Sequence, residues 1–175
     1  ESVHLCAFNN DAAYVVDQVQ SNKVYNLSAT VGMAEPLHSS SVGKCILAFR
    51  PPFAAVRLLK DYPLTAYTPK TITDVDNLME QLAIIRSQGY AVDDEEIALG
   101  VRCIAAPIYD YRGEVNYSLG VSGTTNNIKP SAMDRYLSAL LSASSQISSA
   151  LGYKCGRQSP EVQPPGPYGD SDRDE

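Results

Sequence analysis

Short apolar-rich runs at the start of the chain predict β-strands. Strands of this kind are bounded by turn-forming residues, and one of the runs also alternates between apolar and polar positions. The cluster Asn9-Asn10-Asp11 separates the first two runs, so we expect a β-hairpin there. The three runs are residues 4–8, 13–19 and 24–31.

The middle of the chain changes to helical patterns. An irregular loop is expected at residues 32–38, and the serines at 39–41 are candidates for the N-cap of a helix over residues 42–49. Pro51-Pro52 should end that helix, and a short helix should follow at residues 53–60.

A longer helix follows and has signals at both ends. Thr73 and Asp76 have the spacing of a capping box, and Gly89 is the expected C-terminal glycine. Apolar residues fall on one helical face between these signals. They are Val75, Leu78, Met79, Leu82 and Ile85.

The last third of the chain predicts a second hairpin and a closing helix. Strands are expected at residues 101–109 and 115–123, joined by a turn at 110–113, and a helix is expected at 131–151. Serine and alanine crowd the other faces of this helix, which would allow close packing on the sheet or on another subunit. Its apolar stripe is Met133, Leu137, Leu140, Leu141, Ile147 and Leu151. Strands and helices are partly segregated along the chain, which predicts an α+β domain with a mainly antiparallel sheet.

Composition narrows the class of protein. The 175 residues are 44% hydrophobic, enough for one domain with a core. The net charge of −6 disfavours direct binding of nucleic acid. No apolar run approaches the roughly 18 residues of a membrane span, and no signal peptide is visible, so we expect no membrane partner. Four widely spaced cysteines without a CxxC pair indicate reduced thiols in the cytoplasm, with a disulfide as the less favoured alternative.

Both ends of the chain carry further expectations. Residues 156–175 are rich in proline and glycine and hold two arginines against five acids, so we expect a flexible acidic tail. The chain begins at Glu1 rather than methionine, so we expect a fragment from which an N-terminal partner domain is missing.

Three segments in the same order and spacing resemble the C-terminal effector-binding domain of the IclR family of bacterial transcription regulators. The first is residues 32–48, with Pro36-Leu37-His38 and Gly43-Lys44. The second is residues 89–107, and the third is residues 113–123, which end in Val121-Ser122-Gly123. The resemblance extends over roughly residues 3–153.

The resemblance implies a GAF-like fold, in which helices flank a curved antiparallel sheet with a small-molecule pocket on one side. It implies an effector-binding domain over residues 1–155, homodimers or homotetramers, and DNA contact only through an N-terminal helix-turn-helix domain that is absent from this chain. It implies neither an enzyme nor a cofactor.

The resemblance also assigns pocket positions. Ser41 and Val42 match positions that contact the effector, and the free N–H groups of a helix start would attract a carboxylate; the alternative is that the serines only cap the helix. Asp93 matches a polar pocket position, whereas Asp94, Glu95 and Glu96 are expected on a solvated face. Cys103 matches a cysteine that faces the ligand, and the alternative is a buried structural cysteine.

The remaining pocket positions either form part of the pocket wall or differ from the family pattern. Leu27 matches an apolar wall position, and Ser122 matches the second of two alternating serines. The first of these falls at Gly120, which removes a hydroxyl and should leave more room. Glu35 replaces an apolar residue. If it points inward it favours hydroxyl-rich or amine-bearing ligands and disfavours a second carboxylate, and the alternative is simple exposure on the loop.

These residues predict a sensor domain that binds a small organic acid, such as a sugar acid or keto acid, and thereby switches DNA binding in the full-length protein. One alternative is a thiol-redox enzyme that uses Cys103, although neighbouring acids would raise the pKa of a thiol and make it less reactive. Another is a pure oligomerisation module. His4 and His38 have no partner at metal-ligand spacing, and no G-x-S-x-G, Walker or Rossmann motif is present.

Overall fold

The computed structural model describes residues 1–21 and 29–154. Leu27, most of the strand expected at residues 24–31 and the expected tail at 156–175 lie outside these residues. Residues 29–33, which are described, form no strand.

The elements follow one another in an order close to the one expected. The strands are β1 (Ser2–Asn9), β2 (Ala12–Val19), β3 (Ala34–Glu35), β4 (Ala91–Asp94), β5 (Val101–Tyr109) and β6 (Val115–Thr124). The helices are α1 (Ser41–Ala48), α2 (Pro52–Leu59), α3 (Val75–Gln88) and α4 (Pro130–Ala150).

One antiparallel sheet organises the described residues, with strand order β3-β2-β1-β6-β5-β4. The hairpin between β1 and β2 turns at Asn10 and Asp11, whose φ angles are 47° and 64°. Two-residue hairpin turns of this kind need positive φ at both positions, which Asn and Asp tolerate better than most residues. The β5–β6 hairpin turns at Asp110, whose side chain accepts hydrogen bonds from the backbone N–H groups of Arg112 and Glu114. Both predicted hairpins are confirmed.

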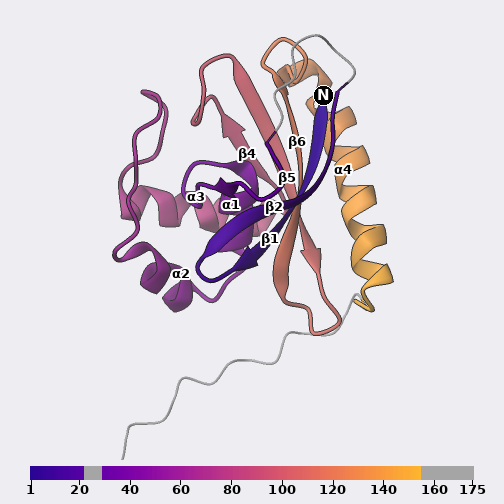
Figure 1. The fold of residues 1–175 in the computed structure, drawn as a ribbon, viewed down its shortest axis with the longest axis horizontal. Helices are drawn as coiled ribbons and strands as arrows, with labels where there is room; N and C mark the ends of the chain where they lie inside the picture. Colours follow the sequence, from indigo (N-terminus) through magenta and orange to yellow (C-terminus); the bar gives the residue numbers. More distant parts are fainter. Residues whose placement is uncertain (22–28, 155–175) are drawn as a thin grey trace, which may run out of the picture.

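Helices cover both faces of the curved sheet (Figure 1): α1, α2 and α3 lie on one side and α4 on the other. Strand side chains alternate between the faces, so each strand contributes to two cores. Cys6, Ala13 and Ala105 pack with the helices of the first side, whereas Ile104 and Ile108 pack with α4. The expected α+β class, with helices flanking a curved antiparallel sheet, is confirmed.

Helix ends agree with the sequence except at one cap. Ser40 caps α1, and Gly89 ends α3 with a φ of 84°. The N-cap of α3 is Asp74, which accepts from the N–H of Asn77 at 2.9 Å, so the prediction of Thr73 was wrong by one residue. Both residues are good caps, and the register of the helix decides between them.

The face of α4 that meets the sheet is more polar than predicted. Leu141 and Leu151 of the predicted apolar stripe are 39% and 43% exposed, so this part of the stripe is not buried. Ser144 and Ser148 are buried instead: Ser144 donates to the carbonyl of Pro107, and Ser148 accepts from the N–H of Tyr109 at 3.0 Å. Small hydroxyl side chains let the helix approach β5 closely and bond to its backbone.

Among residues 1–21 and 29–154, no helix combines the length and the hydropathy that crossing a bilayer would require.

Candidate functional site

The strand register places three predicted site residues in one row across the sheet. Asp93 on β4 is opposite Cys103 on β5, and Cys103 is opposite Ser122 on β6. Residues directly opposite in antiparallel strands point to the same face. This face is the one that α1 covers, because Ala105, two residues from Cys103, packs in the core beneath α1.

β4 was not predicted as a strand, although it carries Asp93. Its inward positions are Ala91 and Asp93. A buried acid at one of two inward positions removes the apolar alternation that would have revealed the strand. Glu35 likewise lies on a strand that was expected to be loop, since β3 pairs it with Ala13.

Helix α1 brings Val42 to this face, and Ser41, its neighbour in the first turn, is buried as well. Val42 lies over β6, because a Cβ at Gly120 would be 2.8 Å from Val42 Cγ1. Ser40 Oγ accepts from the N–H of Gly43 at 3.0 Å, whereas the N–H groups of Ser41 and Val42 have no acceptor within the described part of the chain. The start of α1 therefore offers two free donors and the positive end of the helix dipole.

Gly43 is required by the loop that approaches this helix. A Cβ at residue 43 would lie 2.5 Å from the carbonyl oxygen of Pro36 and 2.7 Å from Leu37 Cα. The same Pro36 carbonyl accepts from Ser40 Oγ at 2.7 Å. Only glycine allows this contact, which holds the loop against the first turn of α1.

Asp93 is a buried carboxyl group with one oxygen unused. Its side chain is 1% exposed, Oδ1 accepts from the N–H of Glu96 at 2.7 Å, and Oδ2 has no partner in the described residues. Burial raises the pKa of Asp93 to about 6, against the opposing effects of the Glu96 hydrogen bond and the charge of Lys44.

Glu35 faces the same site. Burial raises the pKa of Glu35, and the charge of Asp93 raises it further. The charge of Glu35 in turn raises the pKa of the thiols of Cys6 and Cys103. These mutual effects favour the inward orientation over simple exposure, since the side chain is half-buried and close to the others. The site thus holds two carboxyl groups that disfavour each other's ionisation.

Cys103 lies between these groups as a neutral thiol. Burial raises its pKa to about 12, the charge of Asp93 adds to this, and a hydrogen bond with Ser122 opposes it. A thiol with so high a pKa is a poor nucleophile. Arg102 points to the other face, as alternation predicts, and pairs with Asp94 at 2.6 Å. Cys6, Cys45 and Cys103 are free thiols.

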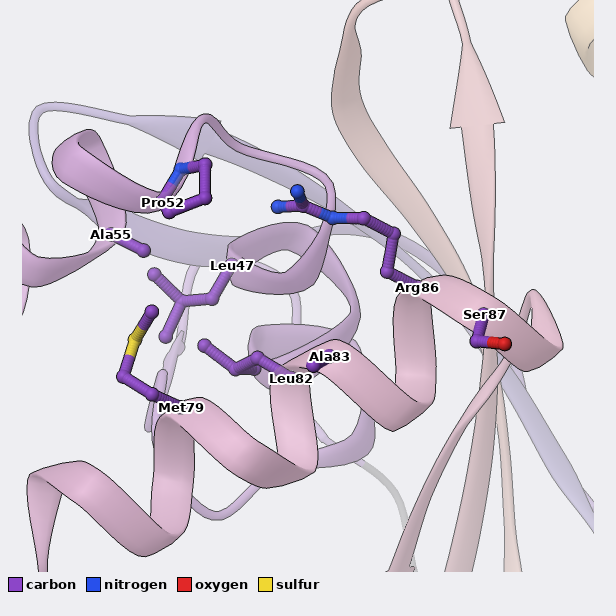
Figure 2. Close-up of a pocket in the computed structure, with 8 residues that line it drawn as sticks. All are labelled: Leu47, Pro52, Ala55, Met79, Leu82, Ala83, Arg86 and Ser87. Atoms are coloured by element: carbon purple, nitrogen blue, oxygen red, sulfur yellow. The ribbon is translucent and has the colours of Figure 1, made fainter.

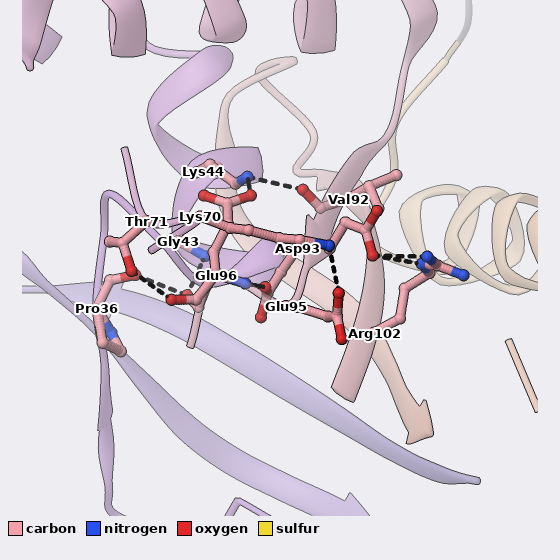
Figure 3. Close-up of polar contacts among 12 residues, drawn as sticks. Pro36, Gly43, Lys44, Lys70, Thr71, Val92, Asp93, Glu95, Glu96 and Arg102 are labelled. Carbon is pink, nitrogen blue, oxygen red and sulfur yellow. Dashed lines mark hydrogen bonds and ion pairs between the residues drawn. The ribbon is translucent and has the colours of Figure 1, made fainter. Parts of the chain in front are cut away.

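A buried ion pair beside Asp93 escaped sequence reasoning (Figure 3). Lys44 is 1% exposed, and its ammonium donates to the carbonyl of Val92 at 2.7 Å and forms an ion pair with Glu96. The prediction that Glu96 is solvated was wrong, because the segment after β4 turns back under α1. The sequence did contain a signal for this pair: a lysine inside an otherwise apolar helix is buried, and a buried charge needs an acidic partner. Asp94 is half-exposed, and Glu95 pairs with Lys70 at the surface.

The expectation of extra room at Gly120 was wrong. A Cβ at this position would lie 2.6 Å from Nε2 and 2.8 Å from Cε1 of His4, which is opposite Gly120 on β1. The imidazole occupies the space that the missing side chain leaves. His38 does not reach into the sheet; it lies on the loop before α1, and its Nε2 is 3.0 Å from the carbonyl of Thr65.

A surface hollow lies elsewhere, between α1, α2 and α3 (Figure 2). It has a volume of about 260 Å³, and none of the seven predicted ligand-binding residues that the structure describes lines it. Its walls are largely apolar, with the Arg86 guanidinium at one end. No group of three or more metal-ligating side chains is arranged to hold a metal ion in the part of the chain that the structure describes.

This fold matches one class of protein domain, the C-terminal domain of a group of bacterial transcription regulators. Residues 1–149 match the family model described as "Bacterial transcriptional regulator IclR C-terminal". The chain belongs to the IclR family, as the resemblance implied.

Relatives and solved structures agree with this assignment. The chain is 34% identical over 148 residues to the HTH-type transcriptional regulator BhcR of Paracoccus denitrificans, which covers 85% of this chain and 53% of BhcR. The C-terminal domain of the Escherichia coli transcriptional regulator KdgR superposes with a TM-score of 0.78 at 31% identity, over 87% of this chain and 88% of that domain. The Thermotoga maritima IclR structure superposes with a TM-score of 0.83 at 33% identity, over 87% of this chain and 62% of that structure.

The chain spans about half the length of the curated relatives that it matches. These relatives are named as transcriptional regulators or repressors, not as enzymes.

Proposed function

We propose that this domain binds a small organic acid, and that binding switches the DNA contact made by an N-terminal domain of the full-length protein in the cytoplasm. The family supports the sensing role, and the face between α1 and the sheet supplies the chemistry. Ser41, Val42, Asp93, Cys103 and Ser122 would line the site, together with Glu35 and Gly120.

One observation carries the proposal: polar atoms are buried at this face without partners. Ser41 and Asp93 are each 1% exposed, and neither Ser41 Oγ nor Asp93 Oδ2 has a hydrogen-bond partner within the described residues. An unsatisfied buried polar group costs about 1–3 kcal/mol. A bound molecule that bonds to both would recover this cost, so the arrangement favours a polar ligand.

The two ends of the site favour different parts of a ligand. The free N–H groups of Ser41 and Val42 suit a carboxylate. Asp93 and Glu35 suit hydroxyl groups, which donate to them, and would repel a second carboxylate. A hydroxylated monocarboxylate, such as a sugar acid, matches both ends better than a dicarboxylate.

Switching needs a difference in affinity between two arrangements of subunits. A ligand that binds one arrangement about 100-fold more tightly shifts the equilibrium by about 2.7 kcal/mol, which is enough for a useful switch. We place this equilibrium in a homodimer or homotetramer, whose attached DNA-binding domains would read the change.

Isothermal titration with four matched compounds tests the proposal. D-gluconate has the carboxylate and the hydroxyls, D-glucitol lacks the carboxylate, hexanoate lacks the hydroxyls, and D-glucarate adds a second carboxylate. We expect the order of affinity to place D-gluconate first. Pyruvate and further keto acids complete the panel. If none of these acids binds, the sensor assignment is refuted.

Two substitutions make the titration specific to the site. Asp93→Asn should weaken D-gluconate binding by about 10- to 150-fold, since one charge-assisted hydrogen bond is worth about 1.5–3 kcal/mol. Asp94→Asn is the matched control, because Asp94 is its neighbour but points to the other face, where it pairs with Arg102. Equal effects of the two substitutions would contradict the placement of the ligand.

A further inference from the structure

His4 is a buried polar side chain that no role described so far uses. It is 6% exposed and lies directly opposite Gly120 in the pairing of β1 with β6. Its ring makes no hydrogen bond to any group within residues 1–21 and 29–154, and its nitrogens are not among the fully buried polar atoms that lack a partner. A polar ring that makes no hydrogen bond to the described residues keeps both nitrogens available to a ligand or to water.

The surroundings of His4 connect it to the candidate site. Its ring occupies the space above Gly120, where a Cβ would meet both the His4 ring and Val42 Cγ1 at 2.6–2.8 Å. His4 is therefore next to the first turn of α1, where the carboxylate of a ligand would bind. On its other side, Gln18 is opposite His4 on β2, and Gln18 Oε1 is buried with no partner in the described part of the chain.

The ring is an uncharged donor and acceptor. Burial lowers the pKa of His4 to about 4, so the imidazole is neutral near pH 7. A neutral imidazole offers one N–H donor and one nitrogen acceptor. A ligand hydroxyl can satisfy either, whereas a methylene group satisfies neither.

We propose that His4 is a specificity-determining residue of the effector site, which recognises a hydroxyl group close to the ligand carboxylate. The His4 ring occupies the space that a side chain at residue 120 would fill, so it can take this position only because residue 120 is glycine. This inference rests on the proposed function and narrows the ligand class to hydroxy acids with a hydroxyl near the carboxylate.

Ring-nitrogen NMR of the unmodified protein is the direct test. The chain has only two histidines, so two sets of ring signals are expected. Saturating D-gluconate should shift the ring nitrogens of His4 and leave those of His38, which is engaged with Thr65, unchanged. The ligand 2-deoxy-D-gluconate, which lacks the hydroxyl beside the carboxylate, should shift His4 much less.

Substitutions at His4 separate recognition from packing. His4→Phe keeps a flat ring but loses both hydrogen-bonding nitrogens, and should weaken D-gluconate about tenfold, as expected for one neutral hydrogen bond of about 1–1.5 kcal/mol. It should barely change binding of 2-deoxy-D-gluconate. His4→Gln keeps a donor and an acceptor and should stay within about threefold of the unmodified protein.

The outcomes distinguish this inference from the proposed function. If D-gluconate shifts the amides of Ser41 and Val42 but neither moves the His4 ring nor distinguishes the two ligands, His4 has no part in recognition and the sensor assignment stands. If no acid of the panel shifts any of these signals, the proposed function fails and the inference fails with it. The NMR measurement uses the unmodified protein, so the inference can still be tested if His4→Phe does not fold.

Discussion

Replacing Lys44 with methionine should destabilise the domain strongly, although the substitution makes the core more apolar. Lys44 is the largest fully buried side chain described, and it holds the Glu96 carboxylate and the Val92 carbonyl. Methionine has a similar volume, so packing changes little. The carboxylate of Glu96, however, would remain buried without its counter-ion.

The size of the stability loss depends on the unpaired Glu96 carboxylate that remains in the core. Removing one partner of a buried ion pair costs about 3–5 kcal/mol, because the remaining charge has lost its solvation and its partner. Burial already raises the pKa of Glu96, and the charge of Lys44 is what opposes this. Lys44→Met removes the opposing effect, so Glu96 must either stay ionised at high cost or take up a proton.

A double variant separates the loss of the ion pair from the burial of a lone charge. Replacing both partners, as Lys44→Met with Glu96→Leu, removes the uncompensated charge and should recover most of the loss, since apolar replacement of a buried pair is often neutral or stabilising. Lys70→Met is the matched control, because the Lys70–Glu95 pair lies at the surface and its loss should leave the unfolding midpoint nearly unchanged.

Urea unfolding at pH 7 and fixed protein concentration measures these differences from the midpoint and slope. We expect the urea midpoint of Lys44→Met to lie far below that of the unmodified protein, and the midpoint of the double variant to lie close to it. A Lys44→Met variant as stable as Lys70→Met would refute the claim that the Lys44–Glu96 pair is buried and coupled.

Three further predictions test the cap, the acid and the thiols. Asp74→Ala should lower the free energy of unfolding by about 1 kcal/mol, because Asp74 is the N-cap of α3, and Thr73→Ala should lower it much less. Urea unfolding measures both, and a larger loss for Thr73→Ala would support the capping box predicted from the sequence. The pKa of Asp93 is raised from 3.8 to about 6 on folding, so the stabilisation is present below pH 4 and is lost as pH rises to about 6. The unmodified protein should therefore lose about 2–3 kcal/mol relative to Asp93→Asn between pH 4 and 6.5, and parallel pH profiles would contradict the burial of this carboxyl. With Cys155 replaced by serine, Ellman's reagent at pH 7.5 should react with the folded domain at least about a hundredfold more slowly than with the unfolded chain, because the pKa of Cys103 is near 12; rapid modification of Cys103 would revive the thiol-redox alternative.

Local patterns in the sequence predicted the elements well where local chemistry determines them. Turn residues at Asn10 and Asp11, the serines before α1 and the glycine after α3 each act on their own backbone. The alternation of β5 also placed Ile104 and Ala105 on opposite faces correctly. These features depend on neighbours within a few residues, which the sequence displays directly.

The errors came from contacts between distant segments. Glu96 looked like part of a solvated acidic run until Lys44, 52 residues away, provided its partner. Gly120 looked like vacant space until His4, on another strand, filled it. The buried serines of α4 replaced part of the expected apolar stripe because the backbone of β5 offers them partners. Such long-range pairings are set by the tertiary fold.

The arrangement around Asp93 also explains why the site should be rigid. Asp93 Oδ1 holds the N–H of Glu96, Glu96 pairs with Lys44 of α1, and the Glu96 carbonyl accepts from Thr71 Oγ1 at 2.6 Å. These bonds connect the sheet, α1 and the loop before α3 (Figure 3). A preorganised carboxyl group lowers the cost of ordering on binding.

A crystal structure of the domain with D-gluconate would show directly where the ligand binds. We expect the ligand carboxylate within hydrogen-bonding distance of the Ser41 and Val42 N–H groups, and a ligand hydroxyl bonded to Asp93 Oδ2. Ligand density in the hollow beside Leu82 and Arg86 (Figure 2), with the face between α1 and the sheet unchanged, would contradict it.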